Sequence, residues 1–186
     1  MLEQLGLAFV VVPAPPAAEA PWDGATAPQA YARQTAAAKA AAVASSHPEA
    51  LVLGADTIVV VDGDVLGKPA DRRQAAAMLR RLSGRTHTVH TGLAIQAPGG
   101  REAQGVETTR VQFRDLSDTD ISAYCATGEP DDKAGAYAIQ GFGATLVERL
   151  DGCYYNVLGF PVTLFLRLLA DVGHRYEIPG RILAEA

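Results

Sequence analysis

An aspartate and a lysine stand on either side of the most strand-like stretch of the sequence. Asp56 comes just before Ile58 and three successive valines, and such a run of β-branched residues is typical of a buried strand. An Asp-Gly pair follows the valines and predicts a hairpin turn, since both residues tolerate positive φ angles. Asp56 is therefore expected at one end of a rigid strand, and Lys68 on the segment that returns after the turn. This pair could handle a phosphate, or it could be a structural ion pair at a strand end.

Three further residues could take part in the same chemistry. Lys39 lies on a predicted helix that runs to about Ser45, on the same face as Tyr31, so its ammonium could reach a cleft or simply extend into water. Lys133 and Gln140 belong to a dense polar stretch with several small residues. The lysines could hold phosphates, and the Gln140 amide, with a donor and an acceptor, suits recognition of a nucleobase edge.

Hydrolysis of a phosphoanhydride needs charge neutralisation, a divalent ion and an activated water. Mg²⁺ and Mn²⁺ prefer carboxylate oxygens and retain waters, so one or two carboxylates suffice on the protein side. Asp56 could coordinate such a metal or accept a proton from the water. The sequence contains no GxSxG elbow, no Walker A motif and no GxGxxG motif, and neither Cys125 nor Cys153 lies in a recognisable nucleophile motif.

The bulk composition limits the possible classes of protein. The 186 residues, 48% hydrophobic and 20% charged, suffice for one globular domain with a real core. The net charge of −5 argues against a large basic surface for nucleic acid. The two cysteines lack metal-binding spacing and are interpreted as reduced packing residues of a cytoplasmic protein. No apolar run approaches a membrane span, and the first residues do not resemble a signal peptide.

The elements that must position these residues alternate between helix and strand. The pattern predicts an α/β (mixed α+β) domain over residues 1–186, with two lobes and a cleft between them. Strands are expected at 8–12, 58–61, 85–96, 102–116 and 144–150, helices at 26–45, 71–83, 117–128 and 161–172, and a loose tail at 173–186.

Several separate segments become informative when they are taken together and in order. They are ADTIVVVDGDVLGKP (55–69), LSGRTHTVHTG (82–92), ETTRVQF (107–113), YCATGEPDDKAGAYAIQG (124–141) and YYNVLGFP (154–161). From about residue 1 to about residue 170 the chain resembles the Maf family of nucleoside triphosphate pyrophosphatases. The resemblance implies a fold related to the inosine triphosphate pyrophosphatases, with an elongated mixed sheet flanked by helices. It also implies metal-dependent hydrolysis of a nucleoside triphosphate to the monophosphate and pyrophosphate.

The resemblance also assigns roles to individual residues. Asp56 matches the family's proton acceptor and, with Glu19, a ligand of the divalent cation, Mg²⁺ or Mn²⁺. Thr57 and Gln140 match positions linked to base selectivity, whereas Lys39, Lys68 and Lys133 match lysines of the phosphate-binding cleft. The Ala-Asp-Thr-Ile and Ala-Tyr-Ala-Ile-Gln-Gly forms resemble the subgroup that acts on dTTP and UTP. A nucleoside triphosphate is thus the expected partner, without nucleic acid or membrane, and a homodimer is a further expectation because the family often forms dimers.

The sequence departs from the family pattern in two places. Family members begin with a strand and a Ser-x-Ser-Pro-Arg-Arg turn, which would contact the triphosphate, whereas this chain begins at MLEQLGL. Glu19 stands one residue out of the usual register of the metal ligand. Either the natural chain begins further upstream, which we favour, or this is a short form with little hydrolysis. The alternative functions are a nucleotide-binding or regulatory module linked to cell division, and a phosphatase that releases inorganic phosphate.

Overall fold

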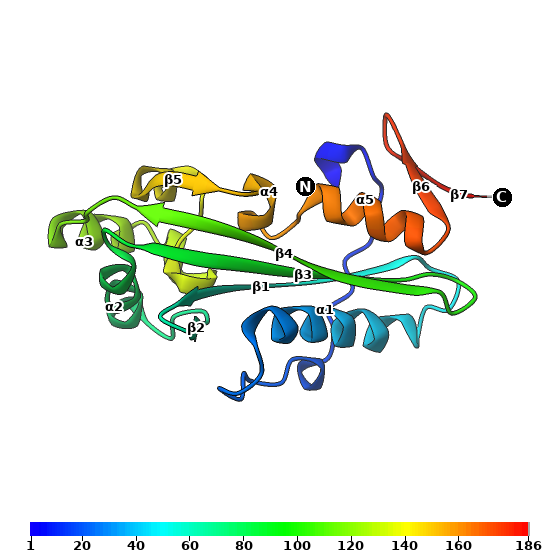
Figure 1. Ribbon diagram of the computed structural model, residues 1–186, viewed down its shortest axis with the longest axis horizontal. Coiled ribbons are helices and arrows are strands. Elements are labelled where there is room, and N and C mark those ends of the chain that lie inside the picture. The colour runs from blue at the N-terminus through cyan, green and yellow to red at the C-terminus, as the bar shows by residue number, and fades with distance from the viewer. Residues whose placement is uncertain (186) are drawn as a thin grey trace.

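The computed structural model describes residues 1–185, and Figure 1 shows a long sheet flanked by helices. The helices are α1 (Pro28–Ala44), α2 (Arg72–Leu82), α3 (Asp118–Ala126), α4 (Tyr154–Val157) and α5 (Val162–Asp171). The strands are β1 (Val52–Val61), β2 (Asp64–Leu66), β3 (Thr86–Gln96), β4 (Glu102–Phe113), β5 (Val147–Asp151), β6 (His174–Glu177) and β7 (Arg181–Ala184). Short 3-10 turns complete the chain: η1 (Glu3–Leu5), η2 (Pro16–Ala18), η3 (Glu129–Asp132), η4 (Ala134–Ala136) and η5 (Gly141–Leu146). The predicted α+β class is confirmed.

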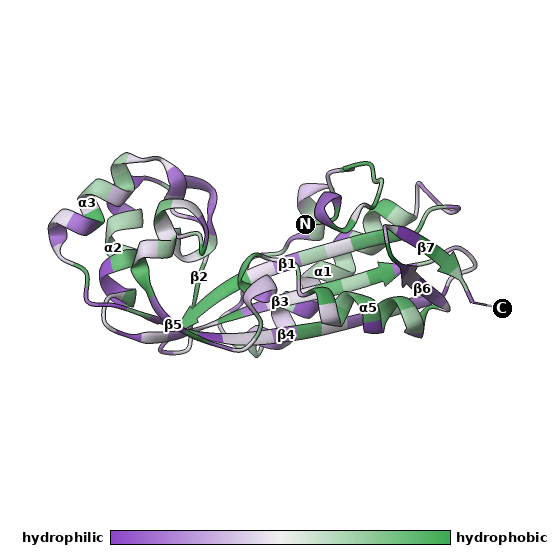
Figure 2. Cartoon of the chain, turned by 90° about the horizontal axis from the view of Figure 1, so that it is seen from above, coloured by the Kyte–Doolittle hydropathy of each residue, from purple (hydrophilic) through white to green (hydrophobic). Residues whose placement is uncertain are grey.

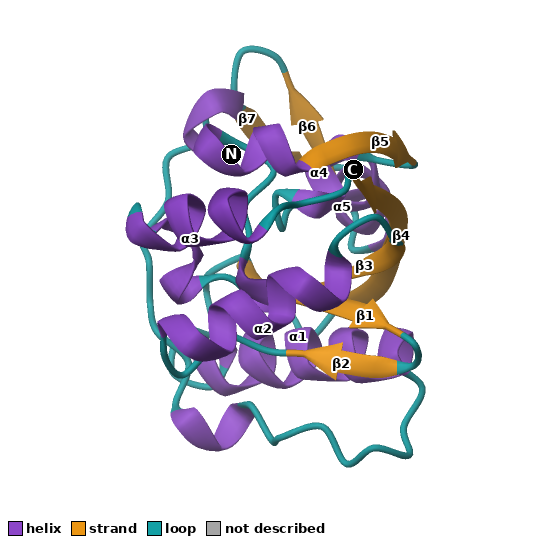
Figure 3. Cartoon of the chain, turned by 90° about the vertical axis from the view of Figure 1, so that its left-hand side faces the viewer, coloured by secondary structure: helices purple, strands orange, loops and turns teal. Residues whose placement is uncertain are grey.

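The main sheet has five strands in the order β2-β1-β3-β4-β5, and Figure 3 shows this order when the molecule is viewed along its long axis. Each pairing within it is antiparallel, so the mixed strand directions implied by the resemblance are not found among residues 1–185. Tight turns join β1 to β2 and β3 to β4, and a tight turn can only connect antiparallel neighbours. Asp56 pairs with Gly92 at the middle of this sheet.

Apolar side chains form separate cores toward the two ends of the sheet. One core packs α2 and α3 against β3 and β4, with Leu79, Phe113 and Ile121 at its centre. The other packs α5 against β3 around Leu93 and Phe165, while α1 covers the opposite face. In Figure 2 the group containing α2 and α3 and the group containing α1 and α5 lie at opposite ends. This arrangement agrees with the predicted two-lobed organisation.

The strand predicted at residues 8–12 is not formed. These residues make no backbone hydrogen bond within residues 1–185, and the side chain of Val10 is 86% exposed. The β-branched composition was misleading, since a strand is stabilised only when a neighbour satisfies its backbone N–H and C=O groups.

The tail predicted to be loose is instead an ordered hairpin, so this prediction was wrong. Strands β6 and β7 are antiparallel, with His174 opposite Ala184 at one end of the pairing and Glu177 opposite Arg181 at the other. The Tyr176 hydroxyl donates a hydrogen bond to the Leu5 carbonyl at 2.8 Å, which joins the hairpin to the beginning of the chain. Tyr176 and Ile182 also pack on the core around α5. In β6, Tyr176 stands between the charged residues Arg175 and Glu177, and this alternation was hidden by the polar composition of the segment.

Candidate functional site

Asp56, Lys39 and Glu19 come together on the face of the sheet covered by α1. The Lys39 ammonium donates a hydrogen bond to Asp56 Oδ1 at 2.7 Å, and its Nζ also lies 2.7 Å from Glu19 Oε2. Asp56 is only 9% exposed, whereas the Glu19 side chain is 58% exposed at the edge of the cluster. The structure therefore places one buried and one accessible carboxylate around a single ammonium.

Two glycines explain why α1 brings Lys39 so close to the sheet. A Cβ atom at Gly92 would lie 2.5 Å from the Ala32 carbonyl carbon and closer still to its oxygen. A Cβ atom at Gly54 would lie 2.9 Å from the Ala40 backbone nitrogen. The backbone of α1 thus rests directly on β1 and β3, which a side chain at either position would prevent. Glycines within two strands, together with an alanine-rich helix, are the signal in the sequence from which this contact could have been predicted.

Burial and charge act in opposite directions on this cluster. Burial raises the pKa of the Asp56 carboxyl, and the neighbouring Glu19 charge adds to the increase. The hydrogen bond from Lys39 acts to lower this pKa, but the net shift is upward. Burial acts to lower the pKa of Lys39, but its hydrogen bonds to Asp56 and Glu19 outweigh this effect and the pKa is raised. Lys39 therefore remains charged, while Asp56 is a stronger proton acceptor than an exposed carboxylate.

The same two carboxylates are the donors available for a divalent cation. Among residues 1–185 no group of three or more histidine, cysteine or acidic side chains could enclose a metal ion. Glu19 and Asp56 nevertheless lie near each other on either side of the Lys39 ammonium, since each has an oxygen 2.7 Å from Lys39 Nζ. Mg²⁺ is commonly held by one or two carboxylates, with waters and substrate phosphates completing its shell. The donor set thus fits a metal shared with a phosphate substrate.

Lys68 and Lys133 lie on the segments after β2 and η3. The Lys133 ammonium donates a hydrogen bond to Asp132 at 2.5 Å. The charge of Lys68 acts to lower the pKa of both Asp132 and Asp56, so Lys68 lies within electrostatic range of the two carboxylates. A backbone hydrogen bond of 3.0 Å from Gly135 to the carbonyl of Gly67 joins the two segments. The structure thus brings one of these lysines toward Asp56 and pairs the other with a neighbouring acid.

Thr57 and Gln140 do not join the Lys39–Asp56 cluster. Successive strand residues point to opposite faces, so Thr57 lies on the face of β1 away from α1. Its hydroxyl contacts the Thr91 hydroxyl of β3 at 2.9 Å. The Gln140 side chain is exposed and makes no hydrogen bond within the described residues. Thr57 and the Lys39–Asp56 pair therefore occupy opposite faces of β1.

The loop that carries Gln140 is fixed by an acid that sequence reasoning missed. Glu129 accepts hydrogen bonds from the backbone N–H groups of Phe142 at 3.0 Å and Gly143 at 2.8 Å, and from the Tyr124 hydroxyl at 2.9 Å. Glu129 is more than ten residues away from Phe142 and Gly143 in the sequence, so no local pattern predicted these contacts.

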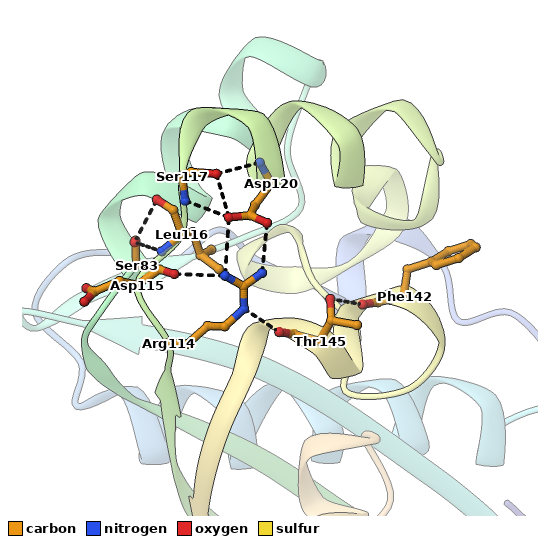
Figure 4. A network of polar contacts seen from close by, with 8 residues as sticks. All are labelled: Ser83, Arg114, Asp115, Leu116, Ser117, Asp120, Phe142 and Thr145. Carbon is orange, nitrogen blue, oxygen red and sulfur yellow. Dashed lines mark hydrogen bonds and ion pairs between the residues drawn. The ribbon is translucent and has the colours of Figure 1, made fainter.

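An arginine holds the far end of the same loop, as Figure 4 shows. The Arg114 guanidinium donates to the Thr145 carbonyl at 2.8 Å and to both carboxylate oxygens of Asp120. Asp120 in turn accepts from the Ser117 backbone and hydroxyl at the start of α3. The position of the loop relative to β4 and α3 is therefore specified at both ends.

Tyr31 is a further residue near the carboxylates. Its hydroxyl donates a hydrogen bond to the Ala20 carbonyl at 2.9 Å, next to Glu19. Burial raises the pKa of Tyr31, and the nearby Asp56 charge adds to this increase. Its position on the same helix face as Lys39 was apparent in the sequence. The structure shows that it closes one side of the cluster and holds the segment that carries Glu19.

Comparison with known proteins gives a consistent result over nearly the whole chain. The family model described as Maf-like protein matches residues 1–172. A dTTP/UTP pyrophosphatase of Pelotomaculum thermopropionicum is 47% identical over 94% of this chain and 91% of that protein. Proteins with the same name from Deinococcus radiodurans and Moorella thermoacetica are 45% and 49% identical, over 93% and 98% of this chain and 87% and 92% of their own lengths.

Proposed function

The chain belongs to the Maf family, and from this premise we propose that it is a pyrophosphatase that hydrolyses dTTP and UTP to the monophosphate and pyrophosphate. The names of its relatives, dTTP/UTP pyrophosphatases, support the substrate class. The observation that carries the proposal is the buried Asp56 carboxylate, which Lys39 holds at 2.7 Å while burial raises its pKa. A carboxylate of this kind is suited to take a proton from an attacking water.

The reaction is hydrolysis of the phosphoanhydride between the α and β phosphates. Asp56 accepts one proton as the oxygen of the water forms its bond to phosphorus and the bond to pyrophosphate breaks. Lys39, Lys68 and Lys133 supply positive charge for the phosphate oxygens, which become more negative as the bond breaks. A divalent cation, Mg²⁺ or Mn²⁺, would be held by Glu19 and Asp56 and would neutralise phosphate charge when bound. We place this activity in the cytoplasm, with the nucleotide as its partner and with no role for nucleic acid.

The described part of the chain has no helix that is both long and apolar enough to cross a membrane. We extend the proposal to an enzyme that needs no membrane for its activity. A homodimer is compatible with it, and size-exclusion chromatography with light scattering measures that property directly.

The test is release of pyrophosphate from dTTP, UTP, CTP, ATP and GTP with Mg²⁺ or Mn²⁺. Asp56→Asn should lower kcat by about 10²- to 10⁴-fold, the usual contribution of a positioned base, while the far-UV circular dichroism is unchanged. Asp62→Asn is the matched control, because Asp62 is an exposed aspartate of the same hairpin that pairs with Arg85.

Each alternative function gives a different product. Release of inorganic phosphate instead of pyrophosphate would identify a phosphatase. Binding of a non-hydrolysable dTTP analogue without turnover would indicate a nucleotide-binding module. Full activity of Asp56→Asn would contradict the assigned role of Asp56.

A further inference from the structure

The Thr57 hydroxyl belongs to a chain of hydrogen bonds that runs from the sheet into α4. Thr57 and Thr91 are paired across β1 and β3, and their hydroxyl oxygens lie 2.9 Å apart. Thr91 is fully buried, and its hydroxyl donates a hydrogen bond to the Asn156 backbone carbonyl at 2.8 Å. Thr57, which the resemblance links to base selectivity, therefore contacts the Thr91 hydroxyl, and Thr91 in turn contacts the Asn156 carbonyl.

The direction of these hydrogen bonds follows from the number of protons. A carbonyl oxygen can only accept, and a threonine hydroxyl has one proton, so the proton between Thr91 and Asn156 belongs to Thr91. Thr91 then has no proton left for Thr57, and Thr57 must donate to Thr91. The reverse arrangement would leave two oxygens 2.8 Å apart without a proton between them, in a buried place where an unmade hydrogen bond is costly.

The Asn156 carbonyl cannot easily move away from Thr91, because the residue is anchored by both its side-chain nitrogen and its backbone. The Asn156 side-chain amide donates to the Val89 carbonyl and to the Thr109 hydroxyl, each at 3.0 Å. The Asn156 carbonyl also accepts from the Gly159 backbone N–H at 2.9 Å. The direction of the Thr57 hydrogen bond is therefore set by the attachment of α4 to the sheet.

A ligand can reach the remaining lone pairs of Thr57. The side chain is only partly buried. A Cβ atom at Gly159 would lie 3.2 Å from Thr57 Oγ1 and would meet nothing else within 4 Å. The glycine thus leaves open the space next to the hydroxyl. Since the Thr57 proton is used internally, what this hydroxyl offers to that space is acceptor capacity alone.

We propose that Thr91 is a positioning residue that makes Thr57 an obligate hydrogen-bond acceptor, and that Thr57 thereby selects bases with a ring N–H. Uracil and thymine carry such a donor at N3, whereas N3 of cytosine is an acceptor and would face the lone pairs of Thr57. The inference rests on the proposed function, which supplies the nucleotide, and it assigns the base to the open space between Thr57 and Gly159. It adds the reason for a preference for dTTP and UTP over CTP.

The test compares selectivity, which a purely structural residue would not alter. We would measure kcat/KM for UTP and CTP, and the dissociation constants of their α,β-imido analogues, for the wild type and three variants. Thr91→Val keeps the shape but removes the acceptor, so the Thr57 proton becomes available and the preference for UTP over CTP should fall by about tenfold or more. Thr91→Ser retains the hydroxyl, and Thr88→Val changes a threonine of the same strand outside this network, so both should keep the wild-type ratio.

A second measurement needs no variant and covers the case in which Thr91→Val does not fold. The wild type should bind 3-methyl-UTP at least about tenfold more weakly than UTP, because the methyl group removes the ring N–H. It should bind 5-methyl-UTP as well as UTP, which controls for the size of a methyl group. Thermal unfolding of each variant shows whether it is folded.

The outcomes separate this inference from the proposed function. Turnover of UTP and CTP with equal efficiency, or an unchanged ratio in folded Thr91→Val, would overturn the inference and leave the pyrophosphatase intact. Selective binding of the UTP analogue without turnover of any nucleotide would support the inference and contradict the proposed hydrolysis. Equal binding of UTP and 3-methyl-UTP would overturn the inference in either case.

Discussion

Substitution of Gly92 by alanine tests whether close contact between α1 and the sheet creates the site. The new Cβ atom would lie 2.5 Å from the carbonyl carbon of Ala32 and 2.7 Å from the backbone nitrogen of Arg33. These neighbours are helix backbone, so they cannot rotate away as a side chain would. We therefore expect α1 to move away from the sheet, and Lys39 with it.

The size of the effect follows from these distances. Carbon atoms pack best at about 3.5–4.0 Å, so relief of the 2.5 Å contact requires a shift of about 1 Å. A gap of this size forfeits roughly a quarter to a half of the local dispersion energy, here for alanines that are at most 1% exposed. Overpacking typically costs about 1–3 kcal/mol, and the rigid backbone neighbours place this case near 3 kcal/mol. A displacement of about 1 Å in a catalytic group can in addition cost about 10²-fold in rate.

Urea denaturation and thermal unfolding measure the loss of stability. With a slope of about 2 kcal/mol per molar urea, a loss of about 3 kcal/mol lowers the midpoint by about 1.5 M. The same loss lowers Tm by roughly 6–12 °C for a chain of this size. Gly105→Ala is the matched control, since the three atoms nearest to its Cβ would all belong to the Leu164 side chain, the first at 2.7 Å, and that side chain can change rotamer. We expect it to cost less than about 1 kcal/mol.

Two results would refute this reasoning. A loss below about 1 kcal/mol for Gly92→Ala would show that α1 does not need a bare backbone beneath it. An equal loss in Gly105→Ala would show that any added methyl group on the sheet has the same effect, whether its neighbour is backbone or side chain.

Three further predictions concern single side chains. Burial lowers the pKa of His87 from its usual value of about 6.5 to about 4. The unfolded chain therefore binds the proton more readily, and the unfolding free energy falls as the pH drops from about 6.5 to about 4. The loss should reach about 3 kcal/mol in urea titrations between pH 7 and pH 4, and it should be absent in His87→Gln. Glu129→Gln puts an amide group opposite two backbone N–H donors and should lower the unfolding free energy by about 1–2 kcal/mol. The KM for UTP should rise, because Gln140 is held less firmly. An unchanged urea midpoint would contradict this prediction. Lys39→Met removes the ammonium that lowers the pKa of Asp56, so the acid limb of the kcat–pH profile should move to higher pH. An acid limb at the wild-type pH would show that Asp56 is not the titrating base.

The local elements could be predicted because their signals lie within a few residues. The β-branched run and its Asp-Gly turn became β1 and β2, and the alternating stretches became the β3–β4 pair. The stripe of apolar residues from Ala75 to Leu82 became the buried face of α2. The roles of Asp56, Thr57 and the lysines came from the resemblance and remain predictions.

The failures arose where structure depends on a partner that is distant in the chain. Residues 8–12 have strand composition but no strand beside them, because pairing and not propensity stabilises a strand. The β6–β7 hairpin is ordered by Tyr176 and Ile182, which pack where the first residues of the chain also lie. Neither contact can be inferred from a window of neighbouring residues.

The order of the amino acids shows which chemical groups are present: an aspartate in a strand, lysines on the segments around it, and a threonine next to that aspartate. How these groups work together depends on the packing of distant segments. The backbone contact between α1 and two strand glycines places Lys39 against Asp56, on one face of the sheet. The attachment of α4 to the other face orients the Thr91 proton and so fixes Thr57 as an acceptor. Strand alternation fixes the face on which each side chain lies, but the direction of a hydrogen bond depends on what packs against that face.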